Sequence, residues 1–322
     1  MPRVLFILGL SLLLSGYGSS LALKAQNLEL LGNYRIAVLS EADAPATIQG
    51  IYRGLSIAQA ELQQRYTIEI QLDRVVLPKA PADISALKAL LDSRPDAIIV
   101  ALPESGLSAK WHSVLSDAEV TYIELGIDSQ GIDGNENLSA DEQALGALAA
   151  KRLLQVMQRS GTIAVVTTNE SSAMQARLAG VLSAFGNRQS HTILKSDPNP
   201  DATHTLLRET VAEDRNRRIR AWLFLDDWAF RAVVDPIWDA SRAPAVAIMS
   251  HPSTSAYLRS GKLAGVLMHP WQDWGIEALH RIIYKIHDRA GERESVTDFP
   301  PHWFPRSASK ELESLWAAWL RE

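Results

Sequence analysis

Polar and acidic side chains directly follow most of the short apolar runs in this sequence. Such side chains offer carboxylate, hydroxyl and amide groups, which hold the hydroxyl groups or cations of a small solute. If the runs are parallel strands, these residues gather at the carboxyl edge of a sheet, where ligands of open α/β sheets bind. The candidate binding residues are Glu41, Asp43, Thr47, Glu104, Asp128, Asn169, Asp226, Asp227, Trp228 and Ser250.

Two of the nine tryptophans stand where they can meet a ligand. Trp228 follows the acidic pair Asp226-Asp227, and Trp271 follows the hinge-like dipeptide His269-Pro270. A tryptophan ring beside a carboxylate can hold a quaternary ammonium or amine-oxide group against its π face. The alternative, that both rings only pack the wall of a cleft, stays open.

The common catalytic and metal-binding motifs are absent from the sequence. It contains no cysteine, which excludes disulfides, thiolate metal sites and a cysteine nucleophile. It has neither the Gly-x-Ser-x-Gly motif of α/β hydrolases nor a dinucleotide fingerprint. A partial calcium-loop pattern has Leu138 in place of the required glycine and Ala144 in place of the glutamate. We therefore expect no enzyme, no metal and no cofactor, with an exported α/β hydrolase as the remaining enzymatic alternative.

A cluster of arginines precedes one of the apolar runs. It consists of Arg215, Arg217, Arg218 and Arg220. Runs of like charge are usually solvated faces, so we interpret this cluster as the exposed end of a helix rather than as an anion site. The formal charge of the whole chain is −5, and this acidic balance argues against a nucleic-acid partner.

Apolar runs alternate with segments of helical period from residue 34 onward, and these are the elements that must position the polar residues. Most runs are continuously apolar, as in parallel strands covered on both faces, whereas residues 68–76 alternate, which favours a strand near a sheet edge. The predicted strands are residues 36–39, 68–76, 97–102, 120–125, 162–166, 221–225, 245–249 and 263–268. The predicted helices are residues 48–62, 145–156, 174–185 and 276–286, with an amphipathic tail helix within 307–322.

This order of elements predicts an α/β fold made of right-handed βαβ units and doubly wound parallel sheets. The strands are too many for one small sheet, and the chain is longer than a single hydrophobic core usually allows. We therefore expect two similar Rossmann-like lobes. The polar stretch of residues 128–139 is the expected crossover between them.

The first 22 residues are predicted to be a signal peptide. Arg3 precedes the apolar run of residues 4–14, which is shorter than the roughly 20 residues of a membrane-spanning helix. Ser20 and Ala22 place small residues where a signal peptidase cleaves, so cleavage is expected after Ala22. Export of a cysteine-free chain of this size fits a Gram-negative periplasm.

Several stretches together resemble the ribose- and galactose-type sugar-binding family of periplasmic binding proteins (type I), whose fold also forms the effector core of lactose-repressor-like regulators. The matching stretches are residues 34–40 leading to Gly54, 94–100, 141–146 with Ala149-Ala150, 177–180, and 260–266 followed by Pro270 and Gly275. The resemblance covers essentially the whole mature chain.

The resemblance implies two lobes joined by a hinge. An N-terminal lobe would comprise residues 34–127 plus 270–295, and a C-terminal lobe would comprise residues 128–269 plus 296–322, including the tail helix. It also implies a monomer that closes over a small polar ligand, sugar-like or cationic, and delivers it to an inner-membrane ABC permease. Some members of the family dock instead on a sensor kinase, and the sequence leaves this alternative open.

The resemblance also implies one further binding residue. At several other positions, this sequence lacks the residue that the family uses. Arg177 matches the family's arginine, which precedes a glycine by one helical turn and holds hydroxyl or carboxylate oxygens of the ligand. The sandwiching aromatic pair is replaced around Ala46-Thr47, and Gly126 and Ser250 stand where aspartates usually end their strands. Met268 replaces the hinge glutamine. These departures favour a ligand other than an ordinary pentose or hexose.

Overall fold

The computed structural model of the chain describes residues 31–41, 45–77, 84–102, 109–126, 136–168, 171–232, 237–249, 251–288 and 299–321. The predicted signal peptide, residues 1–22, lies outside the described residues. Among the helices that are described, none is long and apolar enough to cross a membrane.

Strands and helices alternate along the described chain. The first part contains β1 (Leu31–Glu41), α2 (Pro45–Arg65), β2 (Thr67–Leu77), α3 (Ser85–Asp92), β3 (Ala97–Ala101), α4 (Ala109–Asp117), β4 (Thr121–Leu125) and β5 (Glu136–Leu138). The middle part contains α5 (Glu142–Val156), β6 (Thr162–Thr167), α6 (Ser172–Phe185), β7 (His191–Lys195), α7 (Pro200–Glu213), β8 (Ile219–Phe224) and α8 (Trp228–Arg231). The last part contains β9 (Ala245–Met249), α9 (Thr254–Arg259), β10 (Gly265–Met268), α10 (Trp271–Ile286), β11 (His302–Pro305) and α11 (Ser309–Trp319).

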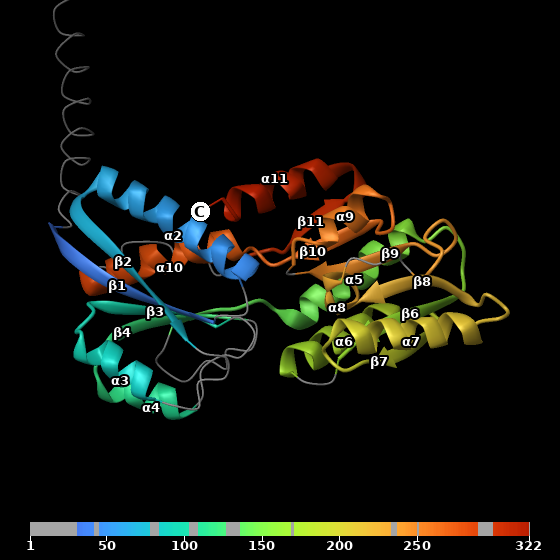
Figure 1. Cartoon of the computed structure of the whole chain (residues 1–322), viewed down its shortest axis with the longest axis horizontal. Coiled ribbons are helices and arrows are strands. Elements are labelled where there is room, and N and C mark those ends of the chain that lie inside the picture. The colour runs from blue at the N-terminus through green and yellow to red at the C-terminus, as the bar shows by residue number, and fades with distance from the viewer. Residues whose placement is uncertain are drawn as a thin grey trace, which may run out of the picture.

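The strands form two sheets that lie side by side, with helices packed on them (Figure 1). Within the described residues, the order is β2-β1-β3-β4-β5 in the first sheet and β11-β10-β9-β8-β6-β7 in the second. Every one of these pairings is parallel except that of β11 with β10. The fold is therefore the predicted α/β class, with two lobes of doubly wound sheet, and the antiparallel edge strand β11 is its one departure from an all-parallel arrangement. We call the lobe of the first sheet the first lobe and that of the second sheet the second lobe.

The predicted elements are present at their predicted places. All eight predicted strands and all four predicted helices occur in the structure, and α11 is the predicted tail helix. The alternating run of residues 68–76 forms β2, which is an edge strand of the first sheet as expected. Sequence periodicity missed β5, β7 and β11, and β5 extends the first sheet to Leu138, past the expected lobe boundary at residue 127.

Two pairs of helices approach each other backbone to backbone at glycines. A Cβ atom at Gly146 of α5 would lie 2.0 Å from the carbonyl oxygen of Arg177 in α6, and Gly180 of α6 makes an equally close approach in return. No side chain larger than hydrogen fits at either position. The glycines therefore bring the start of α5 against the middle of α6. In the first lobe, Gly54 and Gly275 join α2 to α10 in the same way.

Two of the segments through which the chain passes between the lobes are very short. The first crossing, residues 139–141, leads from the end of β5 to the start of α5, and the second crossing, residues 269–270, leads from the end of β10 to the start of α10. α5 packs on the second sheet, whereas α10 packs on the first. Because two or three residues span only about 10 Å even when fully extended, the carboxyl edges of the two sheets must face each other.

The last helix, α11, lies across both lobes (Figure 1). It begins beside the second lobe, where Glu313 pairs with Arg259 of α9 at 2.7 Å. Near its end, Trp319 packs on α2 at Gly50, and its indole N–H donates to Oε1 of Gln272 in α10 at 3.0 Å. Through this helix, the largest hydrophobic core runs without a break from one lobe into the other.

Candidate functional site

An acidic pair stands at the carboxyl end of β8, on the edge that faces the first lobe. The two carboxylates have different surroundings. Asp227 is buried, and its Oδ1 accepts a hydrogen bond from Nε of Arg231 at 2.7 Å. Oδ1 of Asp226 accepts the backbone N–H of Trp228 at 3.2 Å, while its Oδ2 is buried and has no hydrogen-bond partner within the described residues.

The environment of Asp226 favours its protonated form. Burial raises the pKa of Asp226 to about 7, and the negative charge of Asp227 acts in the same direction. The N–H of Trp228 and the charges of Arg177 and Arg231 oppose this shift but do not cancel it. A hydroxyl or ammonium group at the unused oxygen would favour release of this proton, because the ionised carboxylate is the form that accepts hydrogen bonds at both oxygens.

The π face of Trp228 meets a cation of the chain itself. The guanidinium group of Arg231 lies over this ring, 3.9 Å from its centre. On that face of the ring, a cation of the protein itself stands where the sequence predicts a cation of the ligand. Since Arg231 also binds Asp227, Asp226 is left as the acidic group of the pair with an unused oxygen.

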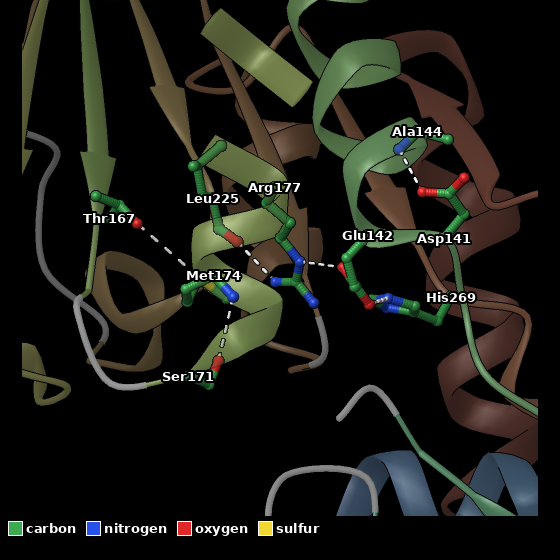
Figure 2. A network of polar contacts seen from close by, with 9 residues as sticks. All are labelled: Asp141, Glu142, Ala144, Thr167, Ser171, Met174, Arg177, Leu225 and His269. Atoms are coloured by element: carbon green, nitrogen blue, oxygen red, sulfur yellow. Dashed lines mark hydrogen bonds and ion pairs between the residues drawn. The ribbon is translucent and has the colours of Figure 1, made fainter. Parts of the chain in front are cut away.

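Arg177 belongs to a buried polar network at the same edge (Figure 2). Its Nε donates to Oε2 of Glu142 at the start of α5, and its Nη1 donates to the carbonyl oxygen of Leu225, directly after β8, at 2.8 Å. The other oxygen of Glu142 pairs with Nε2 of His269 at 2.8 Å. In Figure 2, the remaining Nη2 nitrogen of Arg177 points away from both partners. Arg177 is therefore held at the facing edge by two of its nitrogens, and its Nη2 has no hydrogen-bond partner within the described residues.

Glu142 is the charged centre of this network. Burial alone would raise the pKa of Glu142, but the charge of Arg177 and the contact with His269 lower it to about 2. Glu142 therefore stays ionised at neutral pH. Because it follows the first crossing directly and His269 lies in the second, their contact ties the two crossings together.

The first lobe presents fewer described polar groups at its carboxyl edge. Oγ of Ser40, near the end of β1, lies 3.3 Å from the hydroxyl oxygen of Tyr52 in α2. The guanidinium group of Arg74 in β2 lies over the Tyr52 ring, 4.1 Å from its centre. Burial raises the pKa of Tyr52. The predicted residue Thr47 is buried in the first turns of α2, as is Ala46 beside it.

The structure brings some of the predicted site residues together and leaves others undescribed. Arg177, Asp226, Asp227 and Trp228 meet at the carboxyl end of β8, and Thr47 lies in the other lobe. Trp271 is fully buried, and its ring packs against His269 and Trp274, with centroids 5.0 Å from each. The predicted residues whose side chains lie outside the described part are Glu41, Asp43, Glu104, Asp128, Asn169 and Ser250.

Sequence reasoning missed Glu142, His269 and Arg231. The available signal for Glu142 was its position one turn before Gly146, as Arg177 stands one turn before Gly180. Two helices that touch at such glycines also bring the preceding turns together. For Arg231 the signal was its spacing of four residues from Asp227 on a helix. His269 carried no comparable signal, because its partner Glu142 is distant in sequence.

No cluster of potential metal ligands occurs among the described side chains. The site is instead built from hydrogen-bond donors and acceptors at facing sheet edges. Such an arrangement can bind and orient a small polar molecule.

The chain matches a known protein family. A family model described as "Periplasmic binding protein domain" matches residues 51–285. None of the curated proteins matches the sequence.

Solved structures share the fold at low sequence identity. A periplasmic ribose ABC transporter protein from Conexibacter woesei has 16% identity and a TM-score of 0.71, covering 89% of this chain and 97% of that chain. A periplasmic solute-binding protein from Actinobacillus succinogenes with bound D-allose has 16% identity and a TM-score of 0.70, covering 86% and 99%. A carbohydrate transporter solute-binding protein from Agrobacterium radiobacter in complex with D-arabinose has 15% identity and a TM-score of 0.67, covering 88% and 98%. These neighbours are binding proteins and not enzymes.

Proposed function

The chain belongs to the family of periplasmic binding protein domains, and on this premise we propose that it captures a small polar ligand in the periplasm and delivers it to an ABC-type importer. The ligand is sugar-like or cationic and carries hydroxyl or ammonium donors. Capture takes place between the facing carboxyl edges of the two sheets. The two lobes close over the ligand about the crossings, which excludes water and strengthens its polar contacts.

The observation that carries this proposal is the unused oxygen of Asp226. A buried acceptor without a partner costs free energy in the unliganded protein, and a ligand donor removes that cost. Nη2 of Arg177 lies at the same edge and supplies a donor for a ligand oxygen. One acceptor and one donor at the end of β8 match a molecule that carries both kinds of group.

The loose packing around the two short crossings supports the proposal that they act as a hinge. A cavity of about 130 Å³ lies beside them and is lined by residues of both crossings together with Phe299 and Pro301. This part of the molecule is therefore not packed to the density of a core, and small rotations there meet little steric resistance. Glu142 and His269 border the crossings and keep them in contact during such a rotation.

The remaining members of the proposed site come from both lobes. By their places in the sequence, we propose that Asn169 and Ser250 join the site after β6 and β9, and that Glu41, Asp43, Glu104 and Asp128 join it at or after the ends of β1, β3 and β4, together with Thr47 of α2. Asp227 and Trp228 hold Arg231 and so shape the wall behind Asp226. Trp271 supports the second crossing from the core.

A ligand screen with matched variants tests this function. Purified mature protein is subjected to thermal shift against sugars, polyols, amines and amine oxides. A ligand at 100 times its Kd adds about 2.7 kcal/mol of stability. Compounds that raise the melting temperature are then titrated into the parent protein, Asp226→Asn, and the control Asp117→Asn on the exposed end of α4, and calorimetry gives the Kd for each. Arg177→Ala is a poorer choice, because it leaves Glu142 buried without its cation and destabilises the fold itself.

The expected result is a 1:1 ligand whose affinity falls about tenfold or more in Asp226→Asn and is unchanged in Asp117→Asn. Equal affinity of the ligand for Asp226→Asn and Asp117→Asn would show that Asp226 does not bind the ligand. Conversion of the ligand into a product would favour the hydrolase alternative instead.

The same capture step would also serve a ligand-sensing partner of a membrane sensor kinase. The small buried pair Ala46-Thr47, standing where the family resemblance implies aromatic rings, motivates this second candidate. Affinity purification of the ligand-bound protein with detergent-solubilised inner membrane separates the two. Recovery of a permease supports import, and recovery of a histidine kinase supports sensing.

A further inference from the structure

A cavity of about 520 Å³ opens in the second lobe at the amino ends of β8 and β9. It is lined by the end of α7, the loop that leads into β8, and the segment that precedes β9. The candidate ligand site lies at the opposite end of β8, about 20 Å away along a strand of six residues. The cavity is therefore separate from the space between the lobes.

Four arginines line this cavity, against two acidic residues. Arg215 and Arg217 come from the loop before β8 and Arg220 from the start of β8, while Arg242 comes from the segment before β9, which is distant in sequence. Arg215, Arg217 and Arg218 are exposed after the end of α7, as the sequence predicts, and Arg215, Arg217 and Arg220 also line the concavity. In a chain of net charge −5, this is a local excess of positive charge.

The two acidic residues are already engaged. Both oxygens of Asp214 accept backbone N–H groups, from Arg218 at 2.7 Å and from Ile219 at 3.0 Å. Asp239 pairs with Arg242 at 3.2 Å and accepts from Ser241. Arg215, Arg217 and Arg220 form no ion pair within the described residues. Their charges are therefore available to an anion.

The loop holds these arginines in a defined arrangement. The stem of Arg220 lies over Gly161, where an added Cβ atom would come 2.3 Å from Cγ of the arginine. Arg217 has a φ of 53°, a left-handed conformation that is rare outside glycine, and its N–H donates to the carbonyl oxygen of Asp214 at 2.9 Å. The carboxylate of Asp214 and this turn fix the direction of the loop, which reduces the entropy lost when an anion binds.

The cavity also has an apolar wall. Val211, Ile237, Ala243, Trp222 and Trp238 line it beside the arginines. Trp238 is about 95% buried, and its indole N–H has no hydrogen-bond partner within the described residues. Because this N–H is closed off from the cavity, the rings of Trp222 and Trp238 form an apolar wall. The volume is within the usual range of small-molecule sites.

From these observations we infer that the second lobe carries a second ligand site, which takes an amphipathic small anion. The anionic group, a carboxylate or a phosphate, lies among Arg215, Arg217 and Arg220. The apolar body lies against Trp222 and Trp238. The site works independently of the capture of a polar solute between the lobes.

Calorimetric titration with defined probes tests this inference. The probes are 2-naphthoate and 2-naphthyl phosphate, which carry both an apolar body and a charge. Neutral 2-naphthamide lacks the charge, and inorganic phosphate lacks the apolar body. We expect saturable 1:1 binding of at least one naphthyl anion, about tenfold or more tighter than either reference compound. The difference in affinity between 2-naphthoate and 2-naphthyl phosphate shows whether the site prefers a carboxylate or a phosphate group.

The chain supplies a matched control for the variants. Arg217→Gln and Arg220→Gln are each expected to weaken the naphthyl anion about tenfold, because each removes one charge-assisted contact. Arg218→Gln, in the same loop but not among the lining residues, should bind as the parent does. Arg217→Lys and Arg220→Lys retain the charge and should recover part of the affinity, which separates loss of the site from loss of the fold.

Several results would overturn the inference. These are non-saturable binding of both naphthyl anions, equal affinity for 2-naphthamide or for inorganic phosphate, and equal weakening by Arg218→Gln. Because Asp226→Asn leaves this cavity intact, it should not change binding of the naphthyl anions. A loss in that variant would also contradict the independence of the two sites.

Discussion

Asp226 and Glu142 are two buried carboxyl groups at the same edge of the second sheet, yet their pKa values move in opposite directions. Glu142 is held ionised because Arg177 and His269 each bind one of its oxygens. Asp226 has one backbone N–H and a like-charged neighbour, so burial dominates and raises its pKa. The first carboxylate stabilises the junction of the lobes, while the second is kept available.

The raised pKa of Asp226 predicts a specific pH dependence of stability. Its pKa is about 7 in the folded protein and 3.8 ordinarily, so the unfolded chain releases the proton first. Stability is therefore lost as pH rises from about 4 to 7, by an amount on the order of a few kcal/mol. Asp226→Asn has no such proton and should gain stability relative to the parent across this window. Urea unfolding at a series of pH values measures the difference, and parallel curves for the two proteins would contradict the assignment.

Strand-end reasoning was able to select Asp226, because apolar runs mark the strands and the next residues must lie at the sheet edge, whereas Arg177 was selected by the family resemblance. It did not foresee how these side chains are partnered. The contact of Glu142 with His269 joins residues 127 positions apart, and it forms only because both crossings meet at one place. The contact of Arg231 with Trp228 depends on the rotamers of two neighbouring side chains, which no periodicity reveals.

At the scale of elements, α11 is the part that joins the lobes from outside. Leu312, Trp316 and Trp319 are buried, and the helix touches α9 of one lobe and α2 of the other. Its amphipathic period was visible in the sequence. Its bridging position was not, because nothing in a periodic pattern says which surfaces will cover the apolar side.

Replacing Trp319 should therefore destabilise the whole protein. Trp319→Ala removes a buried ring and its bond to Gln272, and we expect a loss of about 3–5 kcal/mol in the free energy of unfolding. The neighbouring Leu320→Ala is the matched control, since Leu320 is 46% exposed and should change stability by less than about 0.5 kcal/mol. Chemical denaturation of both variants measures this. Equal, small losses would show that the end of α11 does not hold the lobes.

Sequence analysis missed the helices α3, α4, α7, α8 and α9, and the strands that it missed are peripheral. β7 and β11 are edge strands, and β5 is an edge strand of three residues. Edge strands are covered on fewer sides, and the side chains of these three are mixed in polarity, so that they lack the alternating run that revealed the edge strand β2. The strands between them are buried on both faces, which is why their apolar runs were sufficient to predict the parallel sheets.

At the scale of the whole molecule, the two sheets present their carboxyl edges to each other across short crossings. The proposed ligand site lies at this junction, whereas the arginine-lined cavity lies at the far end of the second sheet. The two can therefore be examined separately.

Closure itself can be measured as a distance between the lobes. The chain has no cysteine, so Lys88→Cys on the exposed face of α3 and Glu209→Cys on that of α7 give two unique positions for spin labels. Double electron–electron resonance is recorded without ligand and with a saturating solute identified in the screen. We predict that the ligand shifts the distance distribution to shorter values and narrows it. An unchanged distribution at full occupancy would contradict capture by closure of two lobes.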